Sequence, residues 1–109
     1  MQLLSRRLRA LLPPLGSQEG HPNPMVHARF FRRGSNQTWL VIEGSSSRDD
    51  FVFFGYVTEN PGEWRYIALS QLESECGQLR QRVKRDLRFK SQPFKEVLKH
   101  HKRTKKEQK

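Results

Sequence analysis

Four short apolar runs constrain the fold of this chain more than any other feature. The runs are VHARFF (26–31), TWLVIE (38–43), FVFFGYVT (51–58) and WRYIAL (64–69). Their apolar residues tend to alternate, and successive side chains of a strand point to opposite faces of a sheet, so we expect Val26, Ala28 and Phe30 on one face. Asn60-Pro61-Gly62 predicts a turn, because proline presets φ and glycine accepts a positive φ. The pattern therefore predicts an antiparallel sheet of about four strands.

The third run is the most strand-like, and it is apolar on both faces, which predicts a central position in the sheet. Gly55 interrupts this run, so we expect a bulge or a close approach of another backbone there. We expect Phe51 and Phe53 in the core. Tyr56 and Tyr66 carry hydroxyl groups that prefer a wet edge, and the sequence leaves both a core and a surface position open for them.

Two helices are expected after the strands. Ser70 is the expected N-cap, because Glu73 three residues later completes a capping-box pattern, and this predicts a short helix that ends at Gly77. Residues 80–90 fit either a helical stripe or a strand, and we favour an extended segment. Pro93 suits the first turn of a last helix. Together these elements predict a single-domain α+β fold, in which the C-terminal helix packs on one face of the sheet.

The first 24 residues contain an amphipathic segment with leucines on one helical arc: Leu4, Leu8, Leu11, Leu12 and Leu15. Three interpretations are open, namely an organelle-targeting peptide, a surface or partner helix, or a disordered extension that precedes Met25 as the functional first residue. We favour the extension. The expected organisation is a flexible or amphipathic extension (1–24), an α+β domain (25–99) and a disordered basic tail (100–109).

The positive charge is concentrated at one end of the chain. From residue 80 onward there are thirteen Lys and Arg residues and three Asp and Glu residues, which accounts for the whole net charge of +10. The preceding residues carry eight of each sign and are neutral. A cationic segment of this kind attracts polyanions such as nucleic acid, an acidic protein surface or anionic lipid.

Nucleic acid is the partner that we favour, because Lys and Arg neutralise phosphates and release counterions. Bases in the more ordered segment are expected to make fixed phosphate contacts: Arg82, Lys84, Arg85, Arg88 and Lys90. Bases nearer the end are expected to make mobile contacts: Lys99, Lys102, Arg103, Lys105 and Lys106. Tyr56 and Tyr66 are candidates for stacking on unpaired bases.

A second hypothesis is a small protein-interaction module or inhibitor that binds a host protein, for example a nucleic-acid-handling or defence protein. A basic surface would serve this role equally well, because it can occupy a site that normally holds nucleic acid. One convex basic patch beside exposed aromatic residues would favour nucleic acid, whereas a separate uncovered apolar patch would favour a protein partner.

The sequence predicts neither an enzyme nor a cofactor or metal site. Cys76 has no histidine placed beside it by the sequence, and the histidines lack zinc-ligand spacing. Adjacent acids such as Asp49 and Asp50 are typical of a solvated turn rather than a cation site. A single cysteine requires no oxidising compartment, and no apolar run is long enough to span a membrane, so we expect a cytoplasmic protein.

Over roughly residues 26–98 the chain resembles a family of small uncharacterised domains encoded mainly on bacterial plasmids, phages and other mobile elements. The motifs that carry the resemblance are Thr38-Trp39-Leu40, Phe54-Gly55-Tyr56, Pro61 with Glu63 and Tyr66, Leu69 to Glu73, and Arg85 to Phe89. This chain departs from the family pattern at Arg65, where a glycine is expected, and in its lysine-rich end. The resemblance implies the domain boundaries and a mobile-element setting, and it implies no activity.

Overall fold

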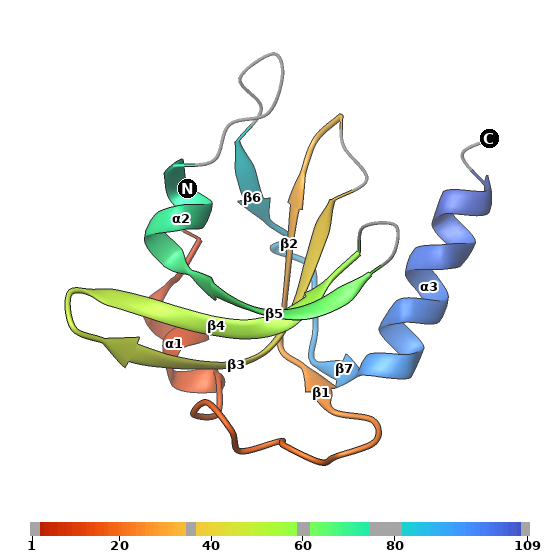
Figure 1. Ribbon diagram of the computed structural model, residues 1–109. Coiled ribbons are helices and arrows are strands. Elements are labelled where there is room, and N and C mark those ends of the chain that lie inside the picture. The colour runs from red at the N-terminus through yellow and green to blue at the C-terminus, as the bar shows by residue number, and fades with distance from the viewer. Residues whose placement is uncertain (1–2, 35–36, 59–61, 75–81, 108–109) are drawn as a thin grey trace.

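The computed structural model describes residues 3–34, 37–58, 62–74 and 82–107. These residues form an antiparallel five-stranded sheet with the order β5-β4-β3-β2-β6 (Figure 1). Its strands are β2 (Ala28–Arg32), β3 (Thr38–Ser47), β4 (Asp50–Val57), β5 (Glu63–Ala68) and β6 (Val83–Arg85). Two further strands pair with each other, β1 (Met25–Val26) and β7 (Gln92–Pro93). The predicted α+β fold is confirmed, and β6 adds a fifth strand to the four expected.

Three helices flank the sheet, namely α1 (Arg6–Leu11), α2 (Leu69–Ser74) and α3 (Phe94–Glu107). Helices α1 and α2 lie on one side of the sheet and α3 lies on the other (Figure 1). We call these sides the α1 face and the α3 face. None of the helices in the described part of the chain is both long and apolar enough to cross a bilayer.

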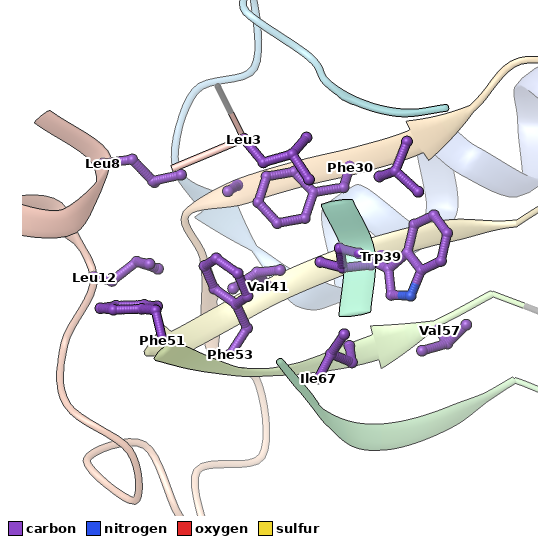
Figure 2. Packing of buried hydrophobic residues seen from close by; sticks show 13 residues of the cluster. Leu3, Leu8, Leu12, Phe30, Trp39, Val41, Phe51, Phe53, Val57 and Ile67 are labelled. Carbon is purple, nitrogen blue, oxygen red and sulfur yellow. The ribbon is translucent and has the colours of Figure 1, made fainter. Parts of the chain in front are cut away.

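The larger core lies between the sheet and the two helices of the α1 face. Figure 2 shows its residues, which include Leu8, Leu12, Phe30, Trp39, Phe51, Phe53 and Ile67. Phe30 packs edge-on against Phe53 with ring centroids 5.3 Å apart, a geometry that aromatic rings favour. Phe51 and Phe53 are therefore core residues, as expected.

The N-terminal segment differs from the extension that we favoured. Leu3, Leu8 and Leu12 are buried in the core of the α1 face. Ser5 caps α1, because its side-chain oxygen accepts a hydrogen bond from the Leu8 N–H. The leucine pattern correctly indicated an amphipathic helix, but its apolar face covers the sheet. The domain consequently begins well before residue 25, because the sheet needs these leucines to cover its aromatic face.

A smaller core lies on the α3 face and contains Val26, Leu40, Ile42 and Val97. Val26 was expected to share a face with Ala28 and Phe30, but those two residues belong to the core of the α1 face. The strand is interrupted at His27, between β1 and β2, so the alternation does not continue through it.

A β-bulge in β3 explains the glycine in β4, which is an interior strand of the sheet beside the central strand β3. The register between β3 and β4 shifts between Val41 and Glu43, and Gly55 pairs with Val41 beside this shift. A Cβ atom on Gly55 would lie 2.4 Å from the carbonyl oxygen of Leu40. Both alternatives expected from the sequence are present together, because the bulge brings the two backbones close at this position.

Helix α2 is present, but its cap is not the predicted one. Ser70 lies inside the helix, and its N–H donates to the carboxylate of Asp50 at 3.2 Å. The hydroxyl of Ser70 also donates to Asp50. A carboxylate from the start of β4 thus takes the role that we assigned to Ser70 itself, which sequence spacing could not show. The predicted helix end at Gly77 lies outside the described residues.

Helix α3 begins at Phe94, directly after Pro93, and continues to Glu107. We expected a disordered tail from residue 100. Lys, Arg, Glu and Gln have high intrinsic helix propensity, and no glycine or proline follows Pro93. The last basic residues therefore extend the helix. The extended conformation favoured for residues 80–90 is confirmed only in β6, because a turn at residues 87 and 88 follows it. Residues 80 and 81 lie outside the described part.

Candidate functional site

A groove of about 700 Å³ lies between α1 and the segment that follows β6. We call it the basic groove, and its lining residues are Ser5, Arg7, Leu8, Leu11, His27, Ala28 and residues 85–91. Arg7, Arg85, Arg88 and Lys90 contribute four positive charges to this lining. Three of these four bases, all except Arg7, were expected from the sequence to bind phosphate.

The N-terminus of α1 and the end of β6 hold one wall of the basic groove in place. The guanidinium of Arg85 donates to the Ser5 hydroxyl oxygen at 2.9 Å, while that oxygen also caps α1. The backbone N–H of Asp86 continues the β2–β6 pairing by donating to the Arg29 carbonyl at 2.9 Å. Arg85 is thus fixed where the two elements meet, and a fixed cation loses less conformational entropy on binding an anion.

Among the described residues that line the groove, Asp86 is the one acid, and its charge is offset. Its carboxylate accepts from the Arg29 guanidinium at 3.3 Å and from the Arg88 N–H at 3.0 Å. The second contact bends the chain after β6 and directs residues 88–90 back toward α1. The net charge of the groove therefore stays positive.

His27 contributes a polar group rather than a further charge. One nitrogen of its ring lies 2.8 Å from the Ser91 hydroxyl. Partial burial lowers the pKa of His27 below its ordinary value. Near neutral pH the ring is consequently uncharged, so His27 adds a hydrogen-bonding group to the lining of the groove.

The remaining predicted bases do not join this groove. Arg82 and Lys84 are exposed, and the alternation along β6 directs them to the face opposite Arg85. Lys99 is exposed on α3. The backbone of α3 also carries four more predicted bases, whose side chains lie outside the described part: Lys102, Arg103, Lys105 and Lys106. The bases expected to make fixed phosphate contacts are therefore divided between two faces of the sheet, and they do not form the one convex patch that would favour nucleic acid.

Five aromatic residues form a cluster on the α3 face, which we call the aromatic cluster: Phe54, Tyr56, Trp64, Tyr66 and Phe94. The sheet register sets it, because Phe54 pairs with Tyr66 and Tyr56 pairs with Trp64 across β4 and β5. Tyr66 is 68% exposed, so this stacking candidate presents an open ring. Tyr56 is half-buried with ring centroids 5.4 Å from Trp64 and 5.1 Å from Phe94, and it is the less accessible candidate.

A second pocket of about 450 Å³ opens beside this cluster. We call it the aromatic pocket. One wall contains Phe54, Trp64, Tyr66 and Phe94, and the other is the loop of residues 16–24 together with Ile42 and Glu43. Sequence reasoning did not identify this pocket, because its two walls come from segments about 40 residues apart that only the fold brings together.

Glu43 ties the loop wall to β3. Its carboxylate is buried and accepts hydrogen bonds from the Gly16 N–H at 2.8 Å and the Gln18 N–H at 2.7 Å. The bulge in β3 explains how Ile42 and Glu43, although adjacent, both line this pocket. Within the described residues, no group of three His, Cys, Asp or Glu side chains is placed to hold a metal ion.

The sequence matches the model of a family described as "Protein of unknown function (DUF2958)" over residues 3–106. The chain belongs to the DUF2958 family. The predicted resemblance to an uncharacterised family is thereby confirmed, and the DUF2958 match extends beyond the range 26–98 at both ends. It includes α1, in agreement with the burial of Leu8 and Leu12. No curated protein and no solved structure matches this DUF2958 protein.

Arg7 and Trp64 are two of the pocket-lining residues that sequence reasoning missed in this DUF2958 protein. Arg7 was assigned to the N-terminal extension, yet it lines the basic groove. Trp64 was assigned only to a strand, yet its side chain is 38% exposed in the aromatic pocket. The alternation of Trp64 with Tyr66 was a usable signal, because it places the two rings on one face of the strand, where the surface position left open for Tyr66 applies to Trp64 as well.

Proposed function

We propose that this DUF2958 protein is a non-enzymatic module that binds nucleic acid, with the basic groove as its main phosphate-binding site. The observation that carries the proposal is the convergence of Arg7, Arg85, Arg88 and Lys90 on one groove, where the single acid is offset by Arg29. Phosphate contacts of this kind supply most of the affinity in sequence-independent binding.

Helix α3 carries a second, separate set of bases along its sequence. The helix lies on the α3 face, as does Tyr66, whose exposed ring offers a platform for an unpaired base. A strand held in the basic groove would therefore have to pass around the sheet to reach Tyr66. We propose that the groove makes the fixed contacts, whereas α3 adds contacts that depend more on ionic strength.

The test measures binding of the full chain to labelled single-stranded and duplex DNA and RNA across a salt series. The double variant Arg88→Gln/Lys90→Gln removes two charges from the groove, and Arg33→Gln/Arg48→Gln removes two from exposed turns elsewhere. We expect the groove variant to reduce the slope of log K against log salt by about 2, because each phosphate contact on duplex DNA contributes about 0.9. The control pair is expected to leave the slope nearly unchanged.

Two results would refute the proposal. One is the absence of binding to any of the four nucleic acids near physiological salt. The other is an equal loss of slope in the groove variant and in the control pair, which would show that net charge alone decides affinity. A quadruple glutamine variant of Lys102, Arg103, Lys105 and Lys106 measures separately how much α3 contributes to the slope of log K against log salt.

A protein-interaction module or inhibitor of a host protein is the second candidate. The observation that favours it is the exposure of two apolar side chains in the lining of the basic groove, Leu11 at 49% and Leu87 at 65%. Apolar side chains at the rim of a charged groove suit a protein surface better than a phosphate backbone. If nucleic acid fails to bind, Leu11→Ser/Leu87→Ser is the variant to compare in a pull-down of host proteins.

We further propose a cytoplasmic protein of a mobile genetic element. The presence of one cysteine in the chain supports the first part, because an internal disulfide would need two. The motif resemblance supports the second part. Fractionation of cells that express the tagged full-length chain tests the location, and the genes beside those of other family members test the setting.

A further inference from the structure

The aromatic pocket differs from the rest of the molecule in the sign of its charge. Its described lining includes the carboxylates of Glu19 and Glu43 and no Lys or Arg, although the chain as a whole has a net charge of +10. His21 also lines it, and its Nδ1 accepts the Asn23 N–H at 3.1 Å. A cation is therefore attracted to this pocket, whereas a phosphate is repelled.

Glu43 contributes to the negative potential of the pocket from a buried position. Only 3% of its surface is exposed, and both of its hydrogen-bond donors, the Gly16 and Gln18 N–H groups, are uncharged. Within the described residues it forms no ion pair. A buried carboxylate that no formal cation offsets produces a negative potential that water screens only weakly.

The wall opposite the loop is suited to the same kind of ligand. Tyr66 and Trp64 expose 68% and 38% of their surfaces, and the faces of aromatic rings attract cations. Phe54 supports both, with ring centroids 5.6 Å from Trp64 and 4.7 Å from Tyr66. A guanidinium group is planar, so it can lie flat on such a ring while its N–H groups donate to a carboxylate.

The loop wall is held in place before any ligand arrives. The Gln18 side chain donates to the Ile42 carbonyl at 2.9 Å and to the Met25 carbonyl at 3.0 Å, and it accepts from the Met25 N–H at 2.6 Å. Together with the Glu43 contacts, these bonds fix the loop to β1 and β3. A preformed pocket avoids the entropy cost of ordering its wall when a ligand binds.

We propose that the aromatic pocket binds an arginine side chain presented by a partner polypeptide. The guanidinium stacks on Tyr66 or Trp64, and the exposed carboxylate of Glu19 accepts its N–H groups, while Glu43 acts through its field. This site is independent of the basic groove. It gives the protein a second binding surface of opposite charge preference. An arginine and an unpaired base would compete for the ring of Tyr66, so a nucleic acid that is bound at the same time as the partner polypeptide is held by the basic groove and not by Tyr66.

The test uses two small probes that differ only in charge, N-acetyl-argininamide and its neutral isostere N-acetyl-citrulline amide. Each is titrated into the full-length protein while the indole N–H resonance of Trp64 is followed by NMR. Trp39 is 3% exposed and serves as the internal control for the fold. We expect the arginine probe to shift the Trp64 resonance saturably and to bind about tenfold more tightly than the citrulline probe. The Trp39 resonance should stay in place.

Matched variants identify the groups responsible. Glu19→Gln should weaken binding of the arginine probe several-fold, whereas Glu73→Gln, which removes an exposed carboxylate from α2, should leave it unchanged. Equal binding of the two probes, an unmoved Trp64 resonance, or equal loss in the two variants would each overturn the proposal. A short single-stranded oligonucleotide that saturates the Trp64 shift at lower concentration than the arginine probe would assign the pocket to nucleobases and overturn it as well.

Discussion

Replacing Glu43 by alanine removes the acceptor that ties the N-terminal loop to the sheet. The wild-type carboxylate accepts the Gly16 and Gln18 N–H groups at 2.8 and 2.7 Å from a buried position. Alanine offers no acceptor, so both N–H groups lose their partner. The loop should then detach locally, while the strands beneath it keep their pairing.

The magnitude of the effect follows from the two contacts. A hydrogen bond to a charged acceptor contributes about 1.5–3 kcal/mol, so the pair contributes up to about 6 kcal/mol. Gly16 is exposed and Gln18 is half-buried, so water can satisfy both donors in part once the loop opens. The variant also avoids the desolvation cost of a buried carboxylate. We therefore expect a loss of about 2–4 kcal/mol in the free energy of unfolding.

Urea unfolding of the full chain measures this loss, and hydrogen exchange locates it. We expect the Gly16 and Gln18 amides to exchange much faster in Glu43→Ala, and Glu73→Ala is the control because its carboxylate is exposed on α2. A change in unfolding free energy below about 0.5 kcal/mol, with both amides still protected, would refute the reasoning. It would show that the carboxylate does not hold the loop.

Two further predictions concern α1 and the start of β4. Leu8→Ala should lower the free energy of unfolding by about 2–5 kcal/mol because Leu8 is buried, whereas Leu11→Ala at an exposed site should change it by no more than about 0.5 kcal/mol. Urea unfolding measures both variants. Equal effects would contradict the placement of α1. The Ser70 hydroxyl, together with the Phe51 and Ser70 N–H groups, holds the pKa of Asp50 below its ordinary value. Its contribution to stability is therefore present at neutral pH and is lost as the pH falls through that lowered pKa. Ser70→Ala should raise the pKa of Asp50 toward the ordinary value in an NMR titration of the carboxyl group, and an unchanged titration would contradict this cause.

The sheet was predictable because its determinants are local. Alternation over four runs indicated β2 to β5, and the glycine at position 55 indicated the tight contact with Leu40 that the bulge creates. The short helix after Ala68 was also predictable from the spacing of Ser70 and Glu73, although Asp50 and not Ser70 supplies the cap. Each of these features depends on residues that are neighbours in the chain, so a periodic pattern is sufficient to reveal them.

The surface against which each amphipathic element packs was not predictable in the same way. The leucines of α1 showed a helix with one apolar side, but nothing in that segment states that the side covers Phe51 and Phe53. The sum of the C-terminal charges was evident from the sequence. Their division between the groove and α3 was not, because the alternation along β6 sends Lys84 and Arg85 to opposite faces.

What the sequence determined by itself is therefore the α+β class, the strands and the concentration of positive charge toward one end. What only the tertiary structure decided is which distant segments share a surface. Arg7 and Arg85 line the same groove, and Glu43 accepts a hydrogen bond from Gly16, although each pair is far apart in the sequence. The physical reason is that burial and electrostatics act through space, whereas periodicity and propensity act along the chain. Both pockets result from contacts through space between segments that are distant in the sequence.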